Sequence, residues 1–376
     1  MNRFAMKPFM SVGARRARGL SLIELMIAIV IGMVIMAFLL ALYINVTRSN
    51  TEMARMNRQI ENGRFAIQLL QSDLAHAGFW GDYIPLFEDR NIASPGDVPT
   101  LVPDPCEASG TWDAIDRNNL IGIPVQDSVG TCGVVSNLQA NTDVLVVRHA
   151  EPVLPAQGNA CPAGEVCFQA SQCANEINFV PSRRYVLGTS GFDLETKDCT
   201  NGAVGATTVP TSTVRRLISN IYYVRNDFTL MRSEYLNGAQ QAAQPLIEGI
   251  EAMRVEYGID NFGGNGAPVS YTGAINRGDG VPDVFVSCAP CNANQLVNAV
   301  AVRIHVLARS LEATPGYTST KTYRLGNAAP LTFSDGIKRH VFTTTVRLVN
   351  PSGRRETPST IFRREKPSAA PPWWSA

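Results

Sequence analysis

Cysteine is the residue type whose pattern in this chain points most directly to a chemistry. The 376-residue sequence contains eight cysteines, and only Cys288 and Cys291 are close neighbours. A zinc site usually needs two such pairs, or one pair with histidines, so the spacing favours disulfides over metal binding or redox chemistry. Dispersed cysteines in even number are typical of an oxidising compartment. The disulfide candidates, with Cys288 and Cys291 as the most plausible pair, are Cys106, Cys132, Cys161, Cys167, Cys173, Cys199, Cys288 and Cys291.

Acidic and amide side chains gather among glycines in two further segments, 260–266 and 276–283. Calcium prefers flexible oxygen-rich loops of this kind, which makes Asp260, Asp279 and Asp283 the calcium candidates. The spacing does not match an EF-hand, and clusters of Asp, Asn and Gly usually form plain turns. We therefore expect turns here, with calcium as the alternative, and we predict no other metal or cofactor.

The common catalytic motifs GxxxxGKS/T, GxSxG and HExxH do not occur in the sequence. The four histidines, at positions 76, 149, 305 and 340, lie far apart and in unrelated sequence contexts. A histidine in such a context is more often structural than catalytic. We therefore predict that the chain is not an enzyme.

Positive charge is not concentrated enough to suggest a nucleic-acid partner. The formal net charge is +1, and the small clusters at 354–355 and 363–364 are typical of a solvated face. A nucleic-acid site would need clustered cations interleaved with aromatic residues. We predict no nucleic-acid binding.

A membrane anchor is predicted by segment 25–44, which has 20 residues and no formal charge. At about 1.5 Å per helical residue it spans about 30 Å, the thickness of the bilayer core. Residues 1–19 carry five basic side chains and no acid, which favours an N-terminus kept in the cytoplasm. An ordinary secretory signal would have a shorter apolar region and a small-residue cleavage motif. A plain anchor leaves Glu24 unexplained, because a carboxylate at the edge of a membrane helix costs about 2–3 kcal/mol.

The sequence around this glutamate, Arg18-Gly19-Leu20-Ser21-Leu22-Ile23-Glu24, resembles the class III signal of type IV prepilins. The resemblance implies that a prepilin peptidase cleaves between Gly19 and Leu20 and that the new amine of Leu20 is N-methylated. It also places Glu24 at the fifth mature position, where the family keeps a glutamate. There the carboxylate would pair with the N-terminal ammonium of a neighbouring subunit and fix the register of the stacked helices. The family most often has Phe at the position of Leu20.

The helical pattern continues beyond the membrane segment. Apolar or small residues recur at alternating steps of three and four, and they are Met53, Met56, Ile60, Gly63, Ile67, Leu70 and Leu74. This stripe predicts that the second half of the helix packs on its own globular domain, with a coiled coil as the alternative. Gly78 supplies a C-cap, so we expect a helix from about Ser21 to about Ala77. Polar residues, Gln59 among them, are expected on the other faces.

Several segments are similar to the PilW-type minor pilins, which are larger than the major pilin and help to initiate pilus assembly. The similarity is strong over the first 80 residues and patchy over 215–350, and it is carried by segments 61–66, 77–81, 245–260, 301–310 and 339–350. It implies partners among other minor pilins, the major pilin, the prepilin peptidase and the inner membrane. It also implies a single-pass protein with its C-terminal domain in the periplasm, incorporated into the pilus.

The expected fold is α+β, with the long helix packed on an antiparallel sheet, because several strand patterns follow one helix without βαβ alternation. Alternating or apolar patterns predict strands at 142–149, 214–225, 227–234, 249–259, 297–309 and 339–350. Segments 82–140 and 155–212 are expected to be loop-dominated and held by cysteines. The predicted organisation is a cleaved leader at 1–19, the helix at 20–78, a periplasmic domain at 79–365 and a flexible tail at 366–376.

The function that fits these features is a minor pilin that acts through helix packing. Two alternatives remain open at this point. The same leader would suit a pseudopilin of a type II secretion system, and an unprocessed anchor would suit a membrane-tethered periplasmic binding or adhesive domain.

Overall fold

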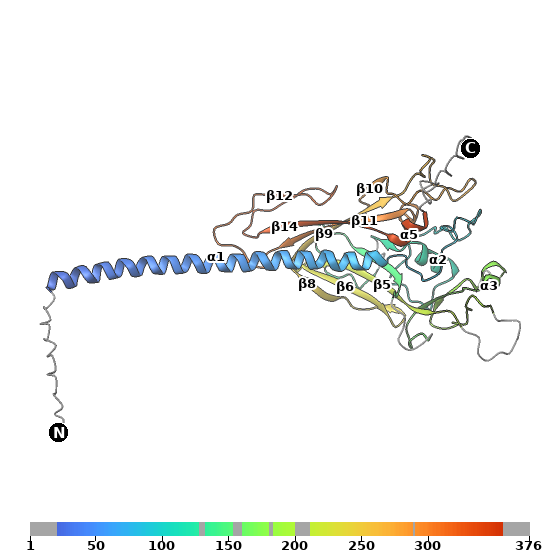
Figure 1. Ribbon diagram of the computed structural model, residues 1–376, viewed down its shortest axis with the longest axis horizontal. Coiled ribbons are helices and arrows are strands. Elements are labelled where there is room, and N and C mark those ends of the chain that lie inside the picture. The colour runs from blue at the N-terminus through green and yellow to red at the C-terminus, as the bar shows by residue number, and fades with distance from the viewer. Residues whose placement is uncertain are drawn as a thin grey trace, which may run out of the picture. The chain divides into compact units, whose positions relative to one another are not determined.

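Helices and antiparallel strands make up the secondary structure (Figure 1). The computed structural model describes residues 21–127, 132–152, 160–179, 183–199, 211–288 and 290–355. The leader cleavage site, cluster 363–364 and the predicted tail lie outside these residues. The helices are α1 (Leu22–His76), α2 (Ala114–Gly122), α3 (Ala174–Phe179), α4 (Ala293–Val297) and α5 (Val349–Arg355).

Two larger sheets contain most of the strands. The eight-stranded sheet has the path β1-β2-β5-β3-β4, with β6 beside β5 and with β7 and β8 beside β6. The four-stranded sheet has the order β10-β9-β11-β14, and β12 pairs with β13. The strands are β1 (Val125–Gln126), β2 (Leu145–Ala150), β3 (Cys167–Ala170), β4 (Tyr185–Gly188), β5 (Val214–Arg225), β6 (Thr229–Leu236), β7 (Ala239–Gln240), β8 (Gln244–Glu248), β9 (Ile250–Ile259), β10 (Val284–Val286), β11 (Ala299–Arg309), β12 (Thr322–Tyr323), β13 (Leu331–Thr332) and β14 (Arg339–Arg347).

The predicted α+β class with antiparallel pairing is confirmed. β9 and β11 pair antiparallel from Ile259 to Ile250, and β14 pairs antiparallel with β11 along the whole length of β14. The predicted strands at 214–225, 249–259 and 297–309 correspond to β5, β9 and β11. Their patterns could be recognised because each strand is long and its side chains fill the core.

Helix α1 ends where the sequence predicts. Gly78 adopts a φ of 70°, a left-handed conformation that glycine reaches without strain, and its N–H donates to the carbonyl of Arg148 in β2. The chain divides into two compact units between Ala54 and Arg55, and α1 belongs to both. The second unit, which we call the body, therefore contains the last turns of α1 together with all the strands.

The body half of α1 packs on its own domain, as predicted, but through a partly different stripe. The buried residues are Gln59, Gly63, Ala66, Leu70 and Leu74. Met53 and Met56 of the predicted stripe are 57% and 45% exposed, since Met53 precedes the body and Met56 lies at its edge. The stripe drifts around the helix since a straight helix has 3.6 residues per turn and not the 3.5 of a heptad.

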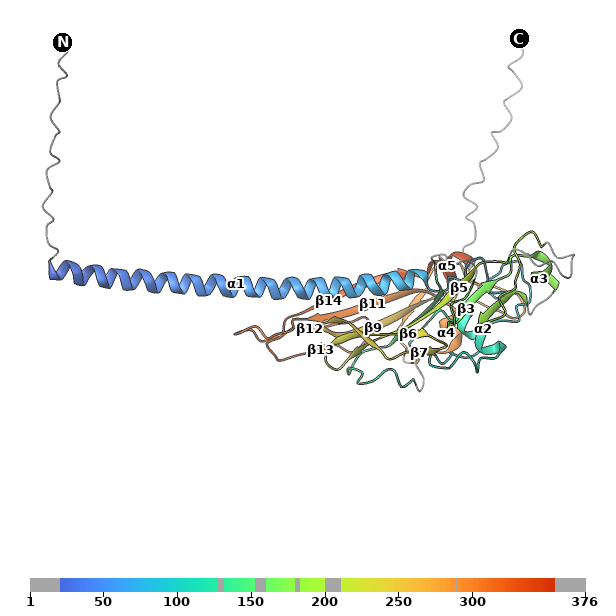
Figure 2. The same ribbon diagram turned by 90° about the horizontal axis from the view of Figure 1, so that it is seen from below.

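The body half of α1 lies along the strands (Figure 2), and a shared core joins it to both sheets. Ala66, Leu70 and Leu74 pack in one cluster with residues of β2, β5, β9, β11 and β14. A second cluster forms under the loops after α1 and contains Trp80, Trp112 and Phe168. The helix is therefore the element that both sheets share.

The regions expected to be irregular contain elements that the sequence did not reveal. Segment 82–140 holds α2, whose capping box pairs the side chains of Asp113 and Asp116 with each other's backbone N–H groups. Segment 155–212 holds β3, α3 and β4. These elements are short, so they carry too few periods of an apolar pattern to be recognised.

The C-terminal end of the body also differs from the prediction. The strand expected at 339–350 stops at Arg347, and α5 follows. The expectation of a solvated face at 354–355 is wrong. Arg355 is 1% exposed and donates to the Val297 carbonyl, and Arg354 pairs with Glu88 at 2.5 Å. Charge clusters can be buried where carbonyl and carboxylate partners surround them.

The close contact at Gly63 generates a stability prediction. A Cβ at this position would overlap the ring of Phe342 in β14. We expect Gly63→Ala to lower the free energy of unfolding by about 1–2 kcal/mol, because overpacking outweighs the gain in helix propensity. Denaturant unfolding of the full chain in detergent, followed by tryptophan fluorescence, measures it.

Gly353→Ala in α5 is the matched control, since nothing lies within 4 Å of a Cβ there. That variant should be unchanged or more stable by up to about 1 kcal/mol. Adding Phe342→Ala to Gly63→Ala should remove the overlap. Equal stability of the two glycine variants would contradict the packing of α1 on β14.

Candidate assembly site

The first part of α1 presents apolar side chains on every face. Each residue from 21 to 51 is exposed, and the exposed large apolar residues run from Leu22 to Val46. In the described part of the chain, α1 is the one helix long and apolar enough to cross a membrane. An all-round apolar helix of this length suits a lipid or helix-lined environment on all sides.

Glu24 lies in the first turn of this helix. Its Oε2 accepts a hydrogen bond from the backbone N–H of Ser21 at 2.8 Å, which is the backbone half of a capping box. Among the described residues, Oε1 has no hydrogen-bond donor. Gly19 and Leu20 lie outside the described residues. The carboxylate therefore caps its own helix with one oxygen and keeps the other available.

Two small residues follow Glu24 along the same face. Ala28 and Gly32 lie four and eight residues further on, which places them one and two turns above the carboxylate. Nothing lies within 4 Å of a Cβ built on Gly32. Small residues let a second helix backbone approach closely in a membrane, so this face offers a contact strip that ends at a carboxylate.

Polar contacts fix α1 where it enters the body. Arg55 forms an ion pair with Glu312 at 2.5 Å, and Asn62 donates to the Glu248 carbonyl at 2.9 Å. Gln59, expected on a polar face, is buried and donates its amide to the carbonyls of Ala308 at 2.8 Å and Lys338 at 3.2 Å. These bonds give the buried amide of Gln59 two acceptors and tie α1 to the ends of β11 and β14.

The opposite face of the same turns stays uncovered. Phe65 is 53% exposed and lies beside Glu61, Arg64 and Gln68, all of which line a shallow groove of about 690 Å³ on α1. We call these four residues the outward face. An exposed aromatic residue flanked by charges of both signs is a composition suited to contact with another helix.

The eight cysteines form four disulfides, and no cysteine is free. Cys288 pairs with Cys291, the pair that the sequence favoured. The other disulfides join Cys106 to Cys132, Cys161 to Cys167, and Cys173 to Cys199. Three of the four disulfides therefore lie within the loop-rich segments, one in 82–140 and two in 155–212, and each brace is internal to its own segment.

The three calcium candidates cap turns. Asp260 is fully buried and accepts from the backbone N–H of Gly280 at 2.8 Å, while burial raises the pKa of its carboxyl group. Asp283 accepts from the backbone N–H groups of Asn261 and Phe262, and Asp279 accepts from that of Val281. The Asp279 contact is an Asx turn, whereas Asp260 and Asp283 each accept from the other loop segment and tie the two segments together. Calcium binding stays a prediction.

Among the described residues, one group of metal-ligating side chains comes close together, and it consists of Asp127, Cys288 and Cys291. Its two cysteines are joined in a disulfide, and Asp127 accepts from the backbone N–H of Cys291 at 3.1 Å. The carboxylate thus serves to hold the turn that carries the disulfide.

Two histidines that are far apart in the sequence come together in the fold. The rings of His76 and His149 have centroids 5.6 Å apart, because the end of α1 packs on β2. His149 Nε2 lies 3.0 Å from Asp73 Oδ1, and Asp73 Oδ2 accepts from the Asn220 amide at 3.0 Å. These contacts tie α1 to β2 and β5. Only the folded topology brings them together, so sequence spacing gave no signal.

Two family comparisons agree with this geometry. The prokaryotic N-terminal methylation motif matches residues 14–40, which include the start of α1 and Glu24. With its exposed apolar helix and antiparallel α+β body, the chain is a prepilin-like pilin. No curated protein and no solved structure matches it.

The second comparison narrows the class. The model of the type IV pilus-assembly protein W family, PilW, matches residues 221–350, from within β5 to the start of α5. Together the two matches indicate a PilW-type minor pilin of the type IV pilus, and neither match indicates catalysis.

The two faces of α1 give a prediction for paired alanine variants. Leu70→Ala removes a fully buried side chain from the main core and should lower the free energy of unfolding by about 2–5 kcal/mol. Phe65→Ala on the outward face should change it by less than about 0.5 kcal/mol. Denaturant unfolding of both full-length variants measures the difference. A large loss of stability for Phe65→Ala would show that the outward face is covered by the chain itself.

Proposed function

We propose that this minor pilin helps to initiate type IV pilus assembly by packing its α1 helix against other minor pilins and the major pilin. The body would lie on the periplasmic side of the inner membrane until the subunit enters the pilus. The observation that carries the proposal is an apolar helix, exposed on all sides, that has Glu24 in its first turn and begins inside a methylation motif.

The role proposed for Glu24 rests on charge pairing. After cleavage between Gly19 and Leu20, a neighbouring subunit would present its N-terminal ammonium near the free Oε1 of this carboxylate. An unpaired charge among apolar helices is unfavourable by several kcal/mol, so the pair forms in one register only. Ala28 and Gly32 support this arrangement, because they allow the neighbouring backbone to approach the same face.

The outward face would extend the contact beyond the membrane segment. Glu61 and Arg64 place a negative and a positive charge beside the exposed ring of Phe65. Charge complementarity as well as shape would therefore determine which partner helix binds. The match of the body to the PilW family over residues 221–350 favours the pilus over a type II secretion system as the assembly that this chain joins.

Processing of the N-terminus is the first test. In cells that contain the prepilin peptidase, intact-mass measurement of the purified chain should give a mature form that starts at N-methylated Leu20. In peptidase-deficient cells the same chain should retain Met1 and remain in the membrane. A chain that begins at Met1 in both strains would contradict the pilin mechanism and favour a plain membrane tether.

Substitution of the carboxylate is the second test. Glu24→Gln keeps an acceptor for the Ser21 N–H but removes the charge, and Glu24→Val removes both. We expect both variants to insert normally in the membrane and to reduce surface pili at least about tenfold, which corresponds to about 1.4 kcal/mol. Sheared pili and membrane fractions are quantified by immunoblotting.

Glu248→Gln is the charge-matched control, since Glu248 is exposed on β8 and its side chain lies outside α1. This variant should assemble normally. Normal piliation with Glu24→Gln would show that a hydrogen-bond acceptor suffices at this position and that charge pairing does not set the register.

A further inference from the structure

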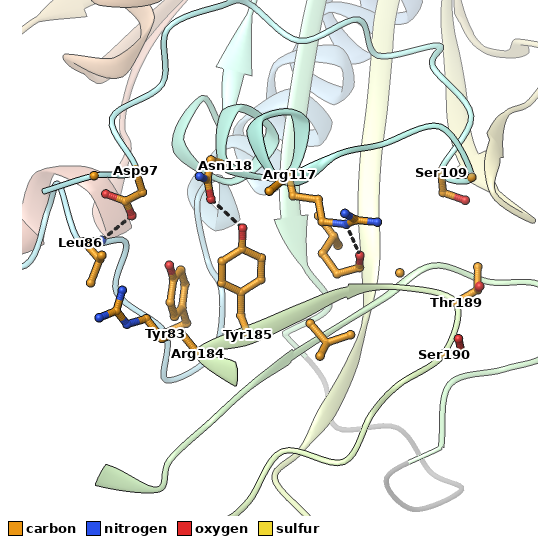
Figure 3. A pocket seen from close by; sticks show the side chains of 16 residues that line it. Tyr83, Leu86, Asp97, Ser109, Arg117, Asn118, Arg184, Tyr185, Thr189 and Ser190 are labelled. Atoms are coloured by element: carbon orange, nitrogen blue, oxygen red, sulfur yellow. Dashed lines mark hydrogen bonds between the residues drawn. The ribbon is translucent and has the colours of Figure 1, made fainter. Parts of the chain in front are cut away.

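We propose that the cleft between α2 and β4 binds an acidic oligosaccharide through the carboxylates of its sugar units. The cleft has a volume of about 840 Å³, within the range of about 300–1,000 Å³ that is usual for ligand sites. Figure 3 shows Arg184 beside Tyr83 at one end and Arg117 directed toward Thr189 and Ser190 at the other. Tyr185 lies between the two ends.

The two arginines are the first step of the argument. Arg117 donates its Nε to the Leu187 carbonyl at 2.9 Å, and Arg184 donates its Nε to the Ile177 carbonyl at 3.0 Å. Among the described residues, neither arginine has a carboxylate within ion-pair distance. The adjacent Arg183, in contrast, pairs with both Glu176 and Asp193. Each cleft arginine is thus oriented by a carbonyl and keeps its terminal N–H groups for a planar anion such as a carboxylate.

The acid of the cleft does not neutralise these arginines. Asp97 is the one acidic residue in the lining, and its two oxygens accept from the backbone N–H groups of Leu86 at 2.7 Å and Phe87 at 2.9 Å. Burial raises the pKa of this carboxyl group, although the two backbone bonds oppose the shift. The cleft therefore keeps an excess of positive charge that a ligand carboxylate can compensate.

Of the two aromatic residues in the lining, Tyr83 is buried in the second core cluster and Tyr185 is partly exposed, so Tyr185 is the ring that a sugar can contact. The rings of Tyr83 and Tyr185 have centroids 5.0 Å apart, and Tyr185 also stacks on Phe168 at 5.9 Å. The Tyr185 hydroxyl donates to Asn118 Oδ1 at 2.7 Å, which fixes the ring. Burial raises the pKa of Tyr185 to about 12, so the phenol stays neutral beside an anionic ligand.

Hydroxyl groups complete the lining. Ser109, Thr189 and Ser190 face the end of the cleft that holds Arg117, and Ser190 and Thr189 are exposed. Side chains that both donate and accept suit the hydroxyl groups of a saccharide. Nucleic acid is less well matched, because a strand needs a track of cations along its phosphates and the lining holds two.

The position of the cleft leaves it accessible during assembly. The cleft is lined by residues of α2 and β4, and Figure 1 shows α2 beyond the C-terminal end of α1. The outward face lies on residues 61–68 of α1. A subunit that packs through α1 would therefore keep the cleft open. The inferred binding activity is independent of the proposed assembly role.

Calorimetric titration of the full chain in detergent micelles with tri-galacturonic acid tests the proposal. We expect a Kd below the millimolar range, weakened at least about tenfold by Arg117→Gln and by Arg184→Gln, because each loses a charge-assisted hydrogen-bond pair. Arg324→Gln removes the same charge from an exposed site outside the cleft and should bind as the unchanged chain does. Thermal unfolding of each variant checks that the body stays folded.

Three outcomes would overturn the assignment. Absence of binding at millimolar tri-galacturonic acid would show that the cleft does not bind acidic oligosaccharides. Equal binding of the fully methyl-esterified trisaccharide would show that carboxylates are not recognised. Tighter binding of tri-glutamate or of a short oligothymidylate would assign the cleft to another ligand class.

Discussion

The exposed apolar half of α1 is the constraint on which the rest of the molecule depends. A helix that is apolar on all faces is stable only where lipid or other apolar helices surround it, and one carboxylate at its start then has few allowed positions. The body has to hold such a helix firmly without enclosing it. It does so by incorporating only the last turns, from Arg55 to His76, into its own core.

Those last turns pack on both sheets with one side and leave the other side in solvent. One side bears Gly63, Ala66, Leu70 and Leu74, which are small or apolar enough to approach both sheets, while Gln59 satisfies carbonyls at the strand ends. The other side keeps Phe65 and its charged neighbours in solvent. Residues of the two sides alternate along the same turns of α1. If the domain covered the outward face, a neighbouring subunit could no longer use that surface. The helix thus serves as core for the body and leaves the outward face exposed for the neighbouring subunit that we propose.

The sequence predicted the long elements well, and its errors share one physical origin. The ends of α1 and the strands β5, β9 and β11 follow from periodicity and from Gly78, which act over neighbouring residues. The burial of Arg355, the contact of His76 with His149 and the cleft around Arg117 depend on residues that are distant in sequence. The stripe on α1 was displaced because its position depends on where the body begins. No local pattern carries that information.

The distribution of the disulfides has a consequence for how this type of chain can diversify. The bonds at Cys106–Cys132, Cys161–Cys167 and Cys173–Cys199 all close before residue 221, where the PilW match begins, and each joins residues of nearby sequence. The matched part contains only the short Cys288–Cys291 bond. The segment between α1 and β5 is therefore braced by its own disulfides, and no disulfide joins it to the matched part of the chain. The loops that these bonds close can therefore change in length without losing their bracing, whereas β2 and β3 pair with β5 and have to stay in the sheet.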